Sequence, residues 1–187
     1  MPVSELRLDL TKTALRKSIF GQIVQNLAED ERYRAAQAMR DASTPKNARL
    51  ETLADVNRAI DISVASSFAR EQTRAVYQIL AEAEGKVHGC APEEAHFHEV
   101  GQGVTLRELL AIASAIEAAS PERIVATPVQ VGSGTVETEH GTLDVPAPAT
   151  AAILEAYSIP IAEPRLEGEL CTPTSAALIA HFVTEFE

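Results

Sequence analysis

Residues 66–85, SSFAREQTRAVYQILAEAEG, decide the fold class of this chain because they form its longest regular apolar pattern. The apolar side chains of this stretch recur at three- and four-residue spacing and share one face: Phe68, Ala75, Val76, Ile79, Leu80 and Ala83. This spacing is the period of an α-helix with one buried side. Gly85 suits a C-terminal stop, because glycine adopts the left-handed conformation that ends many helices. The stretch therefore predicts a long helix from about Ser66 to Gly85.

The residues before this helix also favour helices, after one short strand. Three leucines alternate with polar residues as in a strand: Leu6, Leu8 and Leu10. A four-residue apolar period over residues 12–27 then predicts a helix, with Thr11 or Thr13 available as its N-cap. Further helices are expected over residues 30–40 and 50–60. The first half of the chain is therefore predicted to be helical.

The second half mixes helices with strands. Thr105 and Glu108 form a capping-box pattern, which would open an apolar helix that ends near Ser120-Pro121. Residues 123–131 are then predicted to form a strand. The remaining elements are expected to be a hairpin over 135–145, a helix over 148–157, an edge strand over 159–161 and a helix over 173–186.

These elements predict an α+β fold in a single domain: a helical N-terminal half followed by a mixed region of strands, a hairpin and helices. Thr172 is placed to cap the last helix, with Pro173 in its first turn. Within the domain, residues 1–48 are expected to form a helical N-terminal extension, and residues 49–187 the part that carries the function.

Composition and charge exclude several classes of function. The 187 residues carry 16 basic and 27 acidic side chains, which gives a net charge of −11. Such a surface repels phosphate backbones and the basic residues do not cluster, so nucleic-acid binding is not expected. No apolar run approaches the roughly 18 residues of a membrane span, and no signal-peptide pattern opens the chain. Cys90 and Cys171 give neither a disulfide framework nor a zinc knuckle, so a cytoplasmic protein is expected.

The segment His96-Phe97-His98-Glu99 is the strongest candidate for chemistry. In an extended segment, side chains two residues apart point to the same side, so His96 and His98 would project together, followed by Glu99. Imidazole is a common ligand for nickel, copper and zinc, so these three side chains could form part of a metal site. The alternative is a solvated surface turn, and the spacing alone does not decide between the two.

Gly132-Ser133-Gly134 is a second candidate, in this case for an anion. A glycine-rich turn after a strand can offer its backbone amides to a phosphate. Here the turn leads into a hairpin and not into a helix, so an ordinary bulge or turn is the simpler interpretation. The N-terminus of the helix after Thr172 is another place where an anion could bind.

The other histidines and cysteines have plainer interpretations. His88 follows the long helix and is expected to interact with its terminal carbonyls, and His181 lies inside the last predicted helix. Cys90 and Cys171 are soft enough for nickel, but isolated cysteines are more often small buried apolar groups.

Several separated motifs together resemble those of one known family. In chain order they are LADV at 53–56, LAEAEGKVHG at 80–89, HFHEVG at 96–101, GSGTV at 132–136, HGTL at 140–143, VPAPAT at 145–150 and ELCTPT at 169–174. Their number, order and spacing resemble the LarC family, the nickel-insertion proteins that complete the nickel-pincer nucleotide cofactor of lactate racemase. The resemblance covers residues 53–180, so residues 49–187 would be a LarC-like nickel-insertion domain.

The resemblance implies a CTP-dependent nickel chelatase, or cyclometallase, of the lyase class. Proteins of this kind place nickel into pyridinium-3,5-bisthiocarboxylate mononucleotide and form a carbon–nickel bond and nickel–sulfur bonds. His96, His98 and Glu99 match motif positions and would be metal ligands, and Glu99 and His140 would take catalytic roles as ligand, second-shell partner or proton carrier. Five further matching positions would bind the nucleotide: Gly132, Ser133, Gly134, Thr172 and Thr174.

The chain also departs from the family pattern. Residues 1–47 lack the family's N-terminal Ser-Gly-x-Ser-Gly-Asp segment, and Leu50 and Glu51 stand where the family tends to have a His-Arg pair. Val104 replaces a carboxylate after the His-Glu-Val-Gly motif. A glycine and a proline of the family pattern are Ser175 and Asp144 here. The family portion that binds CTP with Mg or Mn is absent from these 187 residues, so a separate CTP-binding chain is expected as partner.

These departures leave two alternatives to a nickel-insertion component. One is a diverged, non-catalytic structural or regulatory partner of such an enzyme. The other is a nucleotide-binding module. A homo-oligomer is compatible with all three, and neither nucleic acid nor membrane is expected as partner.

Overall fold

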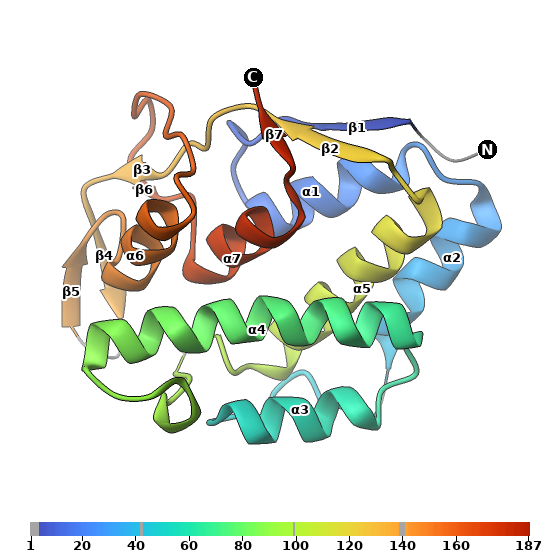
Figure 1. Ribbon diagram of the computed structural model, residues 1–187, viewed down its shortest axis with the longest axis horizontal. Coiled ribbons are helices and arrows are strands. Elements are labelled where there is room, and N and C mark those ends of the chain that lie inside the picture. The colour runs from blue at the N-terminus through green and yellow to red at the C-terminus, as the bar shows by residue number, and fades with distance from the viewer. Residues whose placement is uncertain (1–3, 42, 99, 139–140) are drawn as a thin grey trace.

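The computed structural model describes residues 4–41, 43–98, 100–138 and 141–187. Helix α4 (Ser67–His88) crosses the molecule and packs against α3 (Leu53–Asp61), α5 (Gly103–Ala119), α6 (Pro148–Ala156) and α7 (Pro173–Phe182). In Figure 1 it lies between α3 on one side and a layer of α5, α6 and α7 on the other, with a small sheet at the far edge of that layer. The predicted α+β fold in one domain is confirmed.

Helix α4 begins where the sequence predicts and continues three residues further. The hydroxyl of Ser66 accepts a hydrogen bond from the amide of Ala69 at 3.1 Å and so caps the first turn. Gly85 is not the stop, because it lies inside the helix, where a Cβ would come 2.7 Å from the carbonyl oxygen of Cys90. Gly89 ends the helix instead, with a φ of 69° in the left-handed region.

Helix α5 is apolar on most of its surface and lies at the centre of the molecule. The predicted capping box at its start is wrong: the N-cap is Gln102, and Thr105 and Glu108 lie within the helix. Both side chains contact Arg16 of helix α1 (Leu15–Val24), at 3.2 Å from the Thr105 hydroxyl and 3.2 Å from the Glu108 carboxylate. The Thr105 and Glu108 side chains, which resemble a capping box in the sequence, therefore contact a residue of another helix instead of capping α5.

The helices before α4 follow the predicted order. Helix α1 has Ala14 as its N-cap, at a φ of 51°, so the predicted cap by Thr11 or Thr13 is wrong. The predicted helix over 30–40 divides into α2 (Glu29–Gln37) and a 3-10 helix, η1 (Ala38–Arg40). Helix α3 has a true capping box, in which Thr52 and Asp55 each accept a hydrogen bond from the backbone amide of the other.

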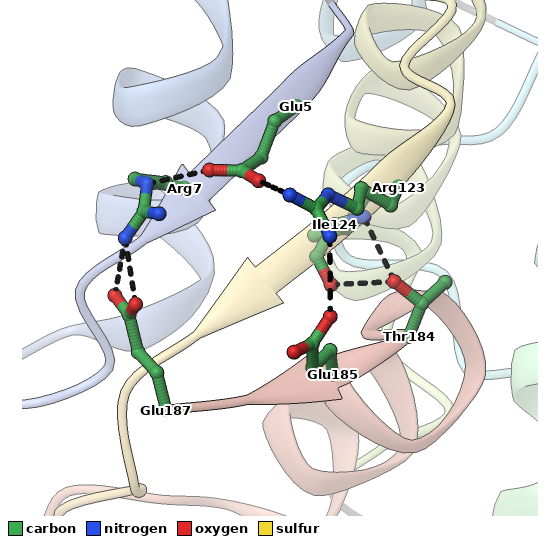
Figure 2. Close-up of polar contacts among 7 residues, drawn as sticks. All are labelled: Glu5, Arg7, Arg123, Ile124, Thr184, Glu185 and Glu187. Atoms are coloured by element: carbon green, nitrogen blue, oxygen red, sulfur yellow. Dashed lines mark hydrogen bonds and ion pairs between the residues drawn. The ribbon is translucent and has the colours of Figure 1, made fainter.

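The three-stranded parallel sheet joins the two ends of the chain. Its order is β1 (Glu5–Leu8), β2 (Arg123–Ala126) and β7 (Glu185–Phe186). The predicted last helix is too long, because α7 ends at Phe182 and the chain continues as β7. Thr184 fixes this strand, since its amide donates to the carbonyl of Ile124 at 2.8 Å. Its hydroxyl donates to the same oxygen at 2.9 Å (Figure 2).

Charged side chains of the three strands and of Glu187 lie side by side across the sheet (Figure 2). Arg7 donates to both carboxylate oxygens of Glu187 at 2.7 Å and pairs with Glu5 at 2.6 Å. Arg123 pairs with Glu5 and, at 3.6 Å, with Glu185, so the pairs form a connected row (Figure 2). Because the arginines are exposed, each pair contributes little to stability.

Two short antiparallel ladders complete the second half. Strand β3 (Gly132–Ser133) pairs with β6 (Gly168–Glu169), and β4 (Thr135–Thr138) pairs with β5 (Gly141–Asp144) in the predicted hairpin. The predicted strand over 123–131 ends at Ala126 as β2. The predicted edge strand over 159–161 is one isolated bridge, between Val129 and Ile161.

Residues on both sides of the predicted boundary at 48 share one hydrophobic core. Leu6, Leu15 and Ile23 lie in the same buried cluster as Leu80 and Leu110. Strand β1 pairs with β2, and α1 and α2 pack on α5. The division into 1–48 and 49–187 stays a prediction about function. Among the described residues, no helix is long and apolar enough to cross a membrane.

Candidate functional site

The segment from Ala95 to Gly101 is held against the start of α3 by backbone hydrogen bonds. The amide of Phe97 donates to the carbonyl of Glu51 at 2.8 Å, and the amide of Leu50 donates to the carbonyl of Gly101 at 2.7 Å. Phe97 is buried. His96 and His98 on either side of it are exposed. The two imidazoles therefore point away from the core, as the alternation predicts.

Two features below the segment fix its position. Tyr77 of α4 is fully buried and its hydroxyl donates to the carbonyl of Val100 at 3.1 Å, while its ring lies 5.7 Å from that of Phe97. Burial raises the pKa of Tyr77, so its hydroxyl keeps its proton and remains a donor. Gly101 permits close approach to the neighbouring segment, because a Cβ there would lie 2.1 Å from the carbonyl oxygen of Leu50.

A cavity of about 230 Å³ opens beside His98. Its described polar lining residues come from three segments of the chain: Glu84, His88, His98 and Thr138. The rest of the described wall is apolar or proline: Val87, Val100, Leu143, Ala147, Pro148, Ala149 and Pro173. Pro148 and Pro173 are the first residues of α6 and α7, so the N-terminal ends of two helices border this cavity. We call it the large cavity only to distinguish it from a smaller one that borders the same segment.

A second cavity, of about 160 Å³, borders the same segment. Its described wall consists of Arg49, Glu51, His96, Phe97 and His98. His98 therefore lines both cavities, whereas His96 lines only the smaller one. The structure thus brings the predicted pair of histidines to one place and gives only His98 access to both sides.

The predicted metal ligands are described only in part. Glu99 and His140 lie outside the described residues, so their predicted roles remain predictions. Within residues 4–41, 43–98, 100–138 and 141–187, no three His, Cys, Asp or Glu side chains gather into a group that could hold a metal ion by itself. Any metal bound between these described side chains would need further donors.

Sequence reasoning missed Glu84 and His88. They are four residues apart in the last turns of α4, with Nε2 of His88 3.5 Å from the carboxylate of Glu84, and both line the large cavity with His98. His88 was expected only to interact with the end of its helix. The available signal was the Glu-x-x-x-His spacing, which places both side chains on one helical face.

The Gly132-Ser133-Gly134 turn lines neither cavity in the described residues. The amide of Gly132 donates to the side chain of Gln130 at 3.2 Å, and the hydroxyl of Ser133 donates to the carbonyl of Leu166 at 3.1 Å. Gly132 has a φ of 89°, and a Cβ there would lie 1.9 Å from the carbonyl oxygen of Gly168. Close approach of β3 to β6 therefore accounts for Gly132 without a phosphate, which favours the simpler interpretation as a turn.

The two glycines of this turn make a matched test of that interpretation. Gly132→Ala is expected to lower the free energy of unfolding by about 3 kcal/mol, because its Cβ meets backbone of β6. Gly134→Ala should cost only about 1 kcal/mol, since its φ of 83° is strained but nothing lies within 4 Å of the new Cβ. Urea unfolding of both variants measures the difference, and equal losses would contradict the close-approach argument.

The Thr172-Pro173-Thr174 stretch forms the predicted helix start. The hydroxyl of Thr172 accepts from the amide of Ser175 at 3.3 Å, Pro173 borders the large cavity and Thr174 is buried. The neighbouring Cys171 is also buried, and burial raises the pKa of its thiol to about 12. A thiol that keeps its proton is a poor metal ligand, which supports the interpretation of Cys171 as a core residue.

Several known proteins are similar in sequence to this chain. A protein of Roseiflexus castenholzii is 33% identical over 179 residues, which are 96% of this chain and 45% of that protein. The pyridinium-3,5-bisthiocarboxylic acid mononucleotide nickel insertion protein of Clostridium kluyveri is 42% identical over 134 residues, 72% of this chain and 33% of that protein. The protein of the same name from Akkermansia muciniphila is 39% identical over 132 residues, 69% of this chain and 31% of that protein.

The chain spans less than half the length of these relatives. No solved structure matches it. The family described as nickel insertion protein matches residues 2–187, which include the His-x-His segment and both cavities. This match and the 33% identity over nearly the whole chain agree, and the chain belongs to the nickel insertion protein family.

Proposed function

We propose that this chain handles nickel for insertion into pyridinium-3,5-bisthiocarboxylate mononucleotide, as a component of a CTP-dependent nickel chelatase. Two relatives carry the name of this substrate. The position of His98 supports the proposal most directly. This side chain lines both a largely apolar cavity and a smaller cavity that His96 also lines.

In this proposal nickel is a substrate that must be bound and then released. His96 and His98 are its ligands, because imidazole binds nickel well and both side chains are exposed on the same segment. Glu99 is a further ligand or orients an imidazole, and His140 is a ligand or a proton carrier. Open coordination positions suit transfer of the metal better than a closed thiolate site does.

The large cavity suits the nucleotide. Its apolar wall, with Val100, Leu143 and Pro148, can cover the flat face of a pyridinium ring. The N-terminal ends of α6 and α7 favour anionic groups such as a phosphate or a thiocarboxylate, because their first amides carry partial positive charge. Pro173 lines this cavity, and the predicted nucleotide-binding residues Thr172 and Thr174 are its neighbours in the chain.

We place CTP, with Mg or Mn, on a separate chain that acts with this one in the cytoplasm. The matched regions make up less than half of these relatives, so we propose the CTP-dependent part of the activity for residues outside this sequence. A homo-oligomer is compatible with this arrangement.

The proposal is tested by a nickel-insertion assay with CTP, the bisthiocarboxylate mononucleotide and a candidate partner chain. His98→Gln is expected to reduce both nickel affinity and insertion by about 10-fold or more, because it removes an imidazole from both cavities. His181→Gln is the control, since His181 of α7 bonds to Gln72 of α4 and lines neither cavity. Equal behaviour of the two variants would exclude His98 as a nickel ligand. Absence of insertion despite intact nickel binding would favour a non-catalytic partner.

A further inference from the structure

A groove between α4 and α6 borders the large cavity. It is an open space of about 440 Å³, and its described wall comes from two helices: Lys86 and Val87 of α4, and Pro148, Ala151, Ala152 and Glu155 of α6. Val87 and Pro148 also line the large cavity, so the two spaces meet at these two side chains. In Figure 1 the last turns of α4 lie beside α6, in agreement with their packing. We call this space the α4–α6 groove.

The proposed substrate is larger than the large cavity can hold. It consists of a pyridinium ring with two thiocarboxylates, a ribose and a phosphate. The cavity of about 230 Å³ is below the roughly 300 Å³ at which pockets for whole small molecules begin. A cavity of this size can cover the ring, and the ribose and phosphate must extend out of it. The α4–α6 groove offers them space beyond the wall that Val87 and Pro148 form.

Lys86 supplies positive charge in this groove. The described wall of the large cavity contains no lysine or arginine, and Lys86 is the one such residue in the described wall of the groove. The whole chain carries a net charge of −11, so an anionic substrate needs a local cation to offset the repulsion.

The present partner of Lys86 leaves it available to a phosphate. Its ammonium lies 3.5 Å from the carboxylate of Glu155, which is longer than the roughly 2.8 Å of a strong charge-assisted hydrogen bond. The side chains of Lys86 and Glu155 are 63% and 80% exposed, and such surface pairs contribute little in water. A phosphate with up to two negative charges can therefore replace Glu155 as the partner of Lys86.

We propose that Lys86 binds the phosphate of the pyridinium mononucleotide in the α4–α6 groove while the ring lies in the large cavity. This inference rests on the proposed function for the identity of the substrate and adds the residue that holds its phosphate. Helix α6 begins at Pro148, in the wall of both spaces, so the partial positive charge of its N-terminus favours the same anion. Glu155 opposes binding, because its carboxylate repels the phosphate and competes for Lys86.

The test is calorimetric titration of the purified chain with the bisthiocarboxylate mononucleotide and with the same compound after a phosphatase has removed its phosphate. Wild type is expected to bind the mononucleotide about 10-fold more tightly than the nucleoside. Lys86→Gln should weaken binding of the mononucleotide by about 5- to 10-fold and leave binding of the nucleoside unchanged. Glu155→Gln should tighten binding of the mononucleotide by about 2-fold, because Lys86 loses its competing partner. If the ion pair served only the structure, the two variants would change binding in the same direction.

Lys12→Gln is the matched control for the loss of one surface charge. Lys12 pairs with Asp9 at 2.9 Å, its side chain is 61% exposed, and it lines neither the groove nor the large cavity. It should bind both compounds as wild type does.

Three results would overturn the inference. The first is wild type that binds the mononucleotide no more tightly than the nucleoside, or binds neither. The second is a mononucleotide affinity that is unchanged in Lys86→Gln. The third is a loss in Arg49→Gln with Lys86→Gln intact, which would place the phosphate in the smaller cavity that Arg49 lines. None of these results involves nickel, so nickel binding and insertion by His98→Gln decide the proposed function separately.

Discussion

Gly101→Ala is expected to lower the free energy of unfolding by about 3 kcal/mol, which in a chain of this size lowers the melting temperature by about 10 °C. The new Cβ would lie 2.1 Å from the carbonyl oxygen of Leu50 and 2.9 Å from Cβ of Phe97. Neither group can move freely, because Leu50 bonds to Gly101 and Phe97 bonds to Glu51 through their backbones. The segment would have to separate from the start of α3.

A glycine-to-alanine substitution in helix α1 should change the free energy of unfolding in the opposite direction. At Gly21 nothing lies within 4 Å of an added Cβ, and the residue is inside a helix. Gly21→Ala is therefore expected to stabilise the chain by about 0.5–1 kcal/mol. Differential scanning calorimetry of the two variants gives both signs. A Gly101→Ala protein as stable as wild type would show that the two segments are not held as closely as the structure indicates.

Gly101 also shows how much of the candidate site could be predicted from the sequence. The spacing of His96 and His98 was enough to place them on one exposed side, because Phe97 between them is apolar and buried. It could not show that Gly101 packs against Leu50, since that contact joins segments that are far apart in the chain. Glu84 and His88 escaped notice for the same reason: their helical spacing is visible, but the cavity that they share with His98 depends on the tertiary fold.

The fold shows the same division between local and distant information. The helices were predictable because their apolar period is local, as in α4 and α5. Strand β7 was not, because Phe182 and Phe186 have a spacing compatible with a helix, and the strand forms only by pairing with β2. The prediction of a capping box at Thr105 was wrong because the side chains of Thr105 and Glu108 contact Arg16 of helix α1.

Arg107 is the clearest case of a side chain whose role only the structure reveals. It lies on α5 with 8% of its surface exposed, and its guanidinium donates to the carbonyls of Thr44 at 2.6 Å and Met39 at 3.3 Å. Its positive charge also lowers the pKa of Asp41. Burial raises the pKa of Asp41, but the amides of Ser43 and Val64 and the charge of Arg107 outweigh that effect and hold its pKa below the usual value.

Arg107→Met is therefore expected to lower the free energy of unfolding at pH 7 by about 3 kcal/mol, because the buried carbonyl of Thr44 and the partly buried carbonyl of Met39 lose a donor and Asp41 loses a nearby positive charge. Arg58→Met is the matched control: Arg58 is exposed and pairs with Asp55 on the surface of α3, so its loss should cost less than about 0.5 kcal/mol. Urea unfolding at pH 7 compares the two, and equal losses would show that Arg107 does not hold the loop after η1.

The pH dependence of this difference tests the electrostatic part of the argument. A depressed pKa of Asp41 in the folded state contributes stability above the pKa of the unfolded chain, and this stability is lost as the pH falls through the folded pKa. In Arg107→Met the pKa of Asp41 should rise, so the variant has less of this stability to lose in acid. The gap between wild type and Arg107→Met should then narrow below about pH 4, the usual range of an aspartate. A gap that stays constant from pH 7 to that range would assign the whole effect to the lost hydrogen bonds at Thr44 and Met39, with no contribution from charge.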